Sequence, residues 1–256
     1  MTKKTIYYPT NDFIFRRIFG TVGNEEITKD FLSSIISDSI ESISLANNVE
    51  LTPANINDKY GILDVKATLN NKMLCDVEMQ VSKDEWMTSR ALFYWSKLYS
   101  KQLKNGDGYS KLNKTIVILI LDYNDNLSSL IPKICTTWHI REDDFPEKLL
   151  TNLLEFHIIN LSKLQKLSFE KDLNTKEIET KYNDFNKRKK LISWLKFVIN
   201  PNVLEEKDMT NKNIKDAKEK FNEIQEDEKE QELAWLRQKY ILDKNSGEQT
   251  AYNNRL

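Results

Sequence analysis

Residues 60–81, YGILDVKATLNNKMLCDVEMQV, contain two runs of alternating apolar and polar side chains, separated by Asn70-Asn71-Lys72. Alternation with a period of two is typical of strands that bury one face, and a short polar segment between two such runs indicates a β-hairpin. One face of this hairpin is apolar. We therefore expect it to pack in a core, while the opposite face carries Asp64, Lys66, Thr68, Asp76, Glu78 and Gln80.

The register of the hairpin follows from its loop. A three-residue loop pairs Leu69 with Met73, and the same register places Asp64 opposite Glu78, with side chains about 5 Å apart at Cβ. Two carboxylates that close repel each other unless a cation lies between them, and a hard divalent ion such as Mg²⁺ prefers oxygen ligands. Alternation alone favours an ordinary solvated sheet face, and we expect Asp76 to be a polar surface neighbour.

The segments around the hairpin predict a mixed α/β chain. Asn11 to Gly20 has the pattern of a short helix with a polar N-cap and a glycine stop, and residues 82–85 form a capping box for a helix that follows the hairpin. Residues 115–121 are apolar on both faces, as in a central strand covered on both sides. We also expect a helix that begins at residue 24, strands at residues 43–51, 134–140 and 154–159, and helices from about residue 176 onward.

Composition excludes several classes of protein. The 256 residues are 30% charged with a net charge of −1, so neither wholesale disorder nor a uniformly basic coat for nucleic acid is expected. Two cysteines and two histidines exclude a disulfide scaffold and a cysteine-rich zinc site, so a metal site would be mainly carboxylate. Neither an apolar leader nor an apolar stretch of membrane-spanning length is evident, and we expect a cytoplasmic protein without a membrane partner.

Asp64, followed by Glu78-Met79-Gln80 and then by the helical segment 90–99, RALFYWSKLY, is similar to one known family. These motifs resemble the PD-(D/E)XK nuclease family transposases, also called recombination-promoting nucleases, in the variant where glutamine replaces the usual lysine. The likeness extends over about residues 10–198. It implies a restriction-endonuclease-like fold, with a mixed central sheet flanked by helices, and Mg²⁺-dependent cleavage of DNA, in which Mn²⁺ could replace Mg²⁺.

The resemblance also assigns roles to residues. It makes Asp64 and Glu78 metal ligands, with the Met79 carbonyl as a third, and places Gln80 where the lysine would act. Asp12 is a candidate accessory acid from the first helix, although its position equally suits a charge at a helix N-terminus. Residues at helical spacing form a basic stripe, which consists of Arg90, Tyr94, Lys97 and Lys101 and is continued by Lys104. This stripe is either a face that contacts DNA or a solvated helix face.

Two regions are expected along the chain. Residues 1–165 would form the nuclease-like core, and residues 166–256 a helical region that packs on the core or extends from it. The acidic tail has a narrow apolar stripe, which predicts a helix laid on another surface and a route to a homo-oligomer or a protein partner. We expect an endonuclease of transposase or recombination-promoting type; the alternative is a catalytically silent, nuclease-derived scaffold that binds DNA or protein. The intact Asp64, Glu78 and Gln80 favour the enzyme.

Overall fold

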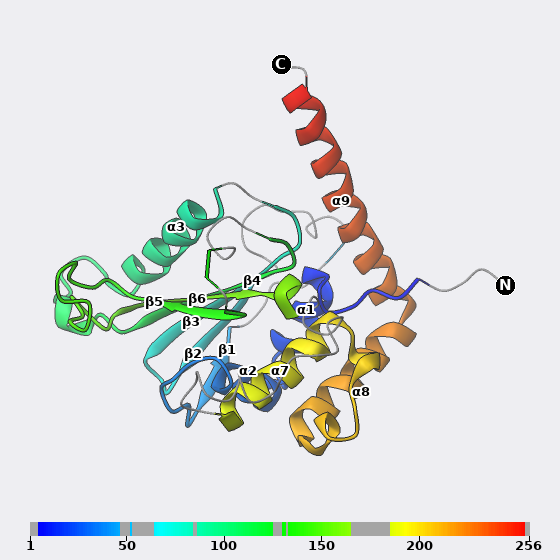
Figure 1. Cartoon of the computed structure of the whole chain (residues 1–256), viewed down its shortest axis with the longest axis horizontal. Coiled ribbons are helices and arrows are strands. Elements are labelled where there is room, and N and C mark those ends of the chain that lie inside the picture. Colours follow the sequence, from blue (N-terminus) through cyan, green and yellow to red (C-terminus); the bar gives the residue numbers. More distant parts are fainter. Residues whose placement is uncertain are drawn as a thin grey trace.

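A mixed sheet of six strands, in the order β1-β2-β3-β4-β6-β5, forms the centre of the protein (Figure 1). The computed structural model describes residues 5–46, 52, 64–83, 86–124, 130–131, 133–164 and 185–253. The central strands β3, β4 and β6 are parallel, and the outer strands pair antiparallel with their neighbours. The strands are β1 (Ile43–Leu45), β2 (Val65–Leu69), β3 (Met73–Gln80), β4 (Thr115–Leu121), β5 (Cys135–Trp138) and β6 (Leu154–Asn160). The predicted α/β class is confirmed.

The hairpin β2–β3 has the register that its loop predicts. Leu69 pairs with Met73, and three residues connect the strands. Asn70 and Asn71 have φ angles of 51° and 57°, in the left-handed region that asparagine tolerates better than most residues. The Asn70 side chain also accepts a hydrogen bond of 2.8 Å from the backbone N–H of Glu41, which fixes the loop against the segment before β1. The register is therefore stabilised both by the backbone conformation of the loop and by its hydrogen bond to the segment before β1.

One face of the sheet packs against helices from both ends of the chain. These are α1 (Asp12–Phe19), α2 (Glu25–Ser33), α7 (Phe185–Ile199) and α8 (Lys212–Glu226). The α1 helix begins at its predicted cap, where the Asn11 side chain accepts hydrogen bonds from two backbone N–H groups, and it ends at Gly20. The Trp194 ring lies 5.6 Å from Phe19 and 5.7 Å from Phe31, so aromatic packing joins α7 to α1 and α2.

The other face of the sheet is covered by α3 (Met87–Ser100), with a smaller apolar cluster between them (Figure 1). The indole Nε1 of Trp95 donates a 3.0 Å hydrogen bond to the carbonyl of Thr115 and ties the helix to the first residue of β4. The capping box predicted at 82–85 does not begin this helix. Trp86 occupies the N-cap position without a side-chain hydrogen bond, and residues 84 and 85 lie outside the described part of the chain.

The carboxyl-terminal helices pack against the same core. Phe221 and Ala217 of α8 are buried in it, which confirms the predicted apolar stripe of a helix laid on a surface. The last helix, α9 (Glu228–Asn253), begins on the body and projects away from it (Figure 1). The expected boundary near residue 165 lies outside the described residues. Short 3-10 turns within the described residues lie at Tyr109–Lys111, Pro201–Val203 and Asp208–Thr210. Within the described ranges, no helix combines the length and apolar character that crossing a bilayer requires.

Candidate functional site

Three carboxylates converge on the face of the sheet that α3 covers. Asp64 immediately precedes β2, while Asp76 and Glu78 lie two residues apart on β3, and each offers an oxygen atom within 4.8 Å of the others. The approach of Asp64 to Glu78 is the one that the register predicts. The expectation that Asp76 is a surface neighbour is wrong, because its side chain is buried and joins the group. Asp76 lies diagonally across the pair of strands from Asp64, within reach of a side chain.

The carboxylate group is electrostatically strained. Burial, and next the charge of Asp64, raises the pKa of Glu78 from 4.5 to about 7. Burial likewise raises the pKa of Asp64, and burial with the Asp64 charge raises that of Asp76 well above its usual value. Lys66 offsets part of this repulsion, with its Nζ 3.6 Å from Asp64 Oδ2. Desolvated carboxylates that repel one another provide a favourable site for a cation.

One oxygen in the group also lacks a partner. Asp76 Oδ1 is buried and accepts no hydrogen bond from any group in the described ranges. A buried polar atom without a partner costs roughly 1–3 kcal/mol, and an ion or water at that atom would remove the cost. The donor set is made of hard oxygen atoms, which suits Mg²⁺ or Mn²⁺ better than a thiophilic metal. The residues present therefore fit a divalent cation.

Gln80 and Arg90 reach the same carboxylate from different elements. The Gln80 amide donates a 3.0 Å hydrogen bond to Glu78 Oε2 from two residues along β3. The guanidinium of Arg90, in the first turn of α3, lies 3.6 Å from the same oxygen. Met79 lies between Glu78 and Gln80, with its side chain in the core on the opposite face. Its backbone carbonyl is the atom that the family resemblance implies as a third metal ligand.

The predicted basic stripe runs along α3 away from the carboxylates. Tyr94 lies near its beginning, since burial and then the negative charge of Glu78 raise the pKa of its hydroxyl. Lys97 and Lys101 are exposed farther along the helix and do not belong to the carboxylate group. Arg90 and Tyr94 are thus placed beside the candidate metal centre, while the two lysines face solvent.

Asp12 lies near the group without joining it. Its charge contributes to raising the pKa of Asp64, but its own carboxylate is held by Arg237 of α9, at 2.7 Å from Nη2 and 3.0 Å from Nε to the same oxygen. The two roles considered for Asp12, accessory acid and helix N-terminal charge, therefore both stay hypotheses. No local sequence pattern points to Arg237, which lies 225 residues away along the chain.

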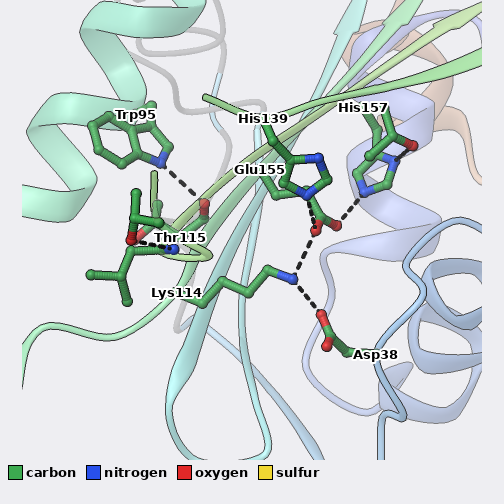
Figure 2. A network of polar contacts seen from close by, with 10 residues as sticks. Asp38, Trp95, Lys114, Thr115, His139, Glu155 and His157 are labelled. Carbon is green, nitrogen blue, oxygen red and sulfur yellow. Dashed lines mark hydrogen bonds and ion pairs between the residues drawn. The ribbon is translucent and has the colours of Figure 1, made fainter. Parts of the chain in front are cut away.

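A second polar network lies on the opposite, core-facing side of the sheet (Figure 2). Glu155 of β6 is hydrogen-bonded to His157 at 2.6 Å and His139 at 3.1 Å, and Lys114 lies 2.7 Å from it and also pairs with Asp38. Burial alone would raise the pKa of Glu155, but hydrogen bonds from His157 and Lys114 outweigh burial and lower it. Both histidines are thus partners of a buried carboxylate.

One family model matches most of the chain. It is described as PD-(D/E)XK nuclease family transposase and covers residues 9–251. The match includes the hairpin with its carboxylates, α3, and the helices that complete the core. No significant match is found among curated proteins or among solved structures.

Proposed function

The chain belongs to the PD-(D/E)XK nuclease family of transposases, and from this premise we propose that it is a metal-dependent endonuclease that hydrolyses phosphodiester bonds in DNA. The observation that carries the proposal is the convergence of Asp64, Asp76 and Glu78 within 4.8 Å on one face of the sheet. Their raised pKa values and the unpartnered Asp76 oxygen support a cation at this position. A family member that had lost its chemistry would not need to keep three acids together at a site where two of them are buried.

Asp64 and Glu78 would hold the cation, with the Met79 carbonyl as a further ligand and Asp76 as an additional carboxylate. We propose Mg²⁺ as the physiological ion and Mn²⁺ as a substitute, because both prefer oxygen ligands. When bound, such an ion lowers the pKa of a coordinated water and stabilises charge on phosphoryl oxygen.

The neighbouring side chains have complementary roles in this proposal. Gln80 has both a donor and an acceptor on one amide, so it can orient the attacking water without adding charge. Arg90 can form paired hydrogen bonds with a phosphate group from its place beside Glu78. The Tyr94 hydroxyl can donate to a phosphate oxygen, and Lys97 and Lys101 would contact the backbone farther from the cut.

Nicking of supercoiled plasmid tests the proposal. Wild-type protein should nick with Mg²⁺ or Mn²⁺ and stop in EDTA, and Asp64→Asn and Asp76→Asn should each abolish nicking. Glu219→Gln, which changes an exposed acid on α8, is the matched control and should nick as the wild type does. DNA binding without nicking under every metal condition would contradict the enzyme and would leave the catalytically silent scaffold.

A further inference from the structure

Two large aromatic side chains on α3 are exposed beside the carboxylate group. Trp86, at the N-cap, is 73% exposed, and Phe93 is 60% exposed. Arg90 lies between them along the helix, since its backbone N–H donates to the Trp86 carbonyl at 2.8 Å and Phe93 follows three residues later. The two residues therefore lie about one helical turn to either side of Arg90, and seven residues of helical rise separate their backbone positions by about 10 Å.

Phe93 is continuous with the candidate metal centre through its neighbour. Its ring centroid lies 5.8 Å from that of Tyr94, with a tilt of 59°. Tyr94 in turn is close enough to Glu78 and Asp64 for their charges to raise its pKa, after the larger effect of burial. The exposed ring of Phe93 is thus separated from the carboxylates by one side chain, that of Tyr94.

The charged side chains within α3 are all of one sign. The α3 sequence MTSRALFYWSKLYS contains Arg90 and Lys97 and no acidic residue, and the exposed Lys101 and Lys104 follow directly after it. Aromatic rings interspersed with basic side chains are the composition of surfaces that bind single-stranded nucleic acid, in which bases stack on the rings and phosphates meet the cations. A protein partner for the same rings would have to be strongly acidic.

We propose that α3 binds unpaired nucleotides, with bases stacked on Trp86 and Phe93 and the backbone alongside Arg90 and Lys97. The faces of paired bases inside a duplex are covered by their neighbours, so exposed rings can stack only on bases that are unpaired or splayed. The substrate class is therefore DNA with a single-stranded segment next to the cleaved phosphate. The position of the cut rests on the proposed function, while the binding of unpaired bases does not.

Fluorescence anisotropy in EDTA separates binding from cleavage. The probes are a labelled single strand, its blunt duplex, and a fork that joins a duplex to two unpaired arms. Phe93→Ala and Trp86→Ala should each weaken binding to the single strand and the fork by roughly 5- to 150-fold, the range found for loss of one base–aromatic stack, and should leave duplex binding unchanged. Phe93→Trp should restore tight binding, because it restores a ring.

Three further measurements distinguish stacking from general disruption. Phe145→Ala removes a ring of similar exposure, 61%, from the connection that leads to the amino-terminal end of β6, and should bind as the wild type does. The salt dependence should keep its slope in Phe93→Ala and lose about 0.7 in Lys97→Ala, because only the lysine displaces counterions from a single strand. A strand that carries 2-aminopurine should be quenched on binding to the wild type and not to Phe93→Ala.

The outcomes are distinguishable. Variants that bind every probe as tightly as the wild type does, or that lose duplex binding equally, would overturn the inference and leave the rings for an acidic protein partner. Ring-dependent binding of unpaired DNA without cleavage in Mg²⁺ would support the inference while removing the nuclease. Cleavage of the fork in Mg²⁺ that is unaffected in Phe93→Ala and Trp86→Ala would overturn the inference while supporting the nuclease.

Discussion

In the absence of divalent metal at pH 8, the Glu78→Gln variant should be more stable than the wild-type protein. The folded protein raises the pKa of Glu78 to about 7 from 4.5, chiefly by burial and by the charge of Asp64. Since one pKa unit corresponds to ~1.4 kcal/mol, this difference corresponds to ~3 kcal/mol of stability that ionised Glu78 removes at pH 8. Glutamine has nearly the same shape and stays neutral, so it should recover most of that free energy.

The sign of the pH dependence follows from the direction of the shift. A carboxyl group whose pKa is higher in the folded state favours unfolding once it ionises, so its destabilising effect is complete above pH 7 and disappears below about pH 4.5. At pH 5 the advantage of the variant should therefore fall below about 1 kcal/mol. Added Mg²⁺ should stabilise the wild type more than the variant, because the variant has lost one of the proposed ligands.

Urea denaturation in EDTA at pH 5 and pH 8 measures these differences. Glu219→Gln, at an exposed position on α8, is the matched control and should follow the wild type at both pH values. The reasoning is refuted if Glu78→Gln is no more stable than the wild type at pH 8, or if its advantage is the same at both pH values.

Three further substitutions examine other contacts. Gln80→Ala should slow single-turnover cleavage by about 10²–10³-fold at saturating Mg²⁺ and leave metal affinity unchanged; a wild-type rate would reduce Gln80 to a strand-surface amide. Arg237→Ala should lower the free energy of unfolding by roughly 3–5 kcal/mol, because it leaves Asp12 buried without its partner, whereas an unchanged urea midpoint would show that the contact is dispensable. Glu155→Gln should cost about 2–3 kcal/mol at pH 7 by weakening its contacts with Lys114 and His157. Since the folded state lowers the pKa of Glu155, this loss should shrink as the pH falls below about 4.5, and a loss that is constant with pH would contradict the ion-pair account.

The hairpin could be predicted because its determinants are local. Alternation assigns each residue to a face, and the three-residue loop sets the register, so the approach of Asp64 to Glu78 follows from a continuous stretch of chain. The same alternation places Asp76 on the carboxylate face but does not give its depth. Its burial depends on how α3 lies across the sheet, which is a tertiary contact.

Contacts between distant segments could not be read from the sequence. Asp12 and Arg237 are 225 residues apart, and the sequence around either residue does not predict its contact with the other. The predicted start of α3, at the capping box of residues 82–85, is wrong for a related reason. A capping box is a local preference of about 1 kcal/mol, and the packing of Met87 and Ala91 against β4 and β6 outweighs it in deciding where the helix begins.

The position of the carboxylates in the sheet explains why they remain together despite their repulsion. Asp76 and Glu78 point to the same face because they are two residues apart on β3, and β3 is fixed in place by hydrogen bonds to β2 on one side and β4 on the other. Lys66 and Arg90 supply positive charge at 3.6 Å from Asp64 and Glu78, which does not prevent the three pKa values from rising. The metal-free fold thus keeps an unfavourable charge arrangement that a bound cation would relieve. In the proposed nuclease, ion binding becomes more favourable as the pH rises toward 7, because the ligands must first release the protons that burial and then mutual repulsion make them hold.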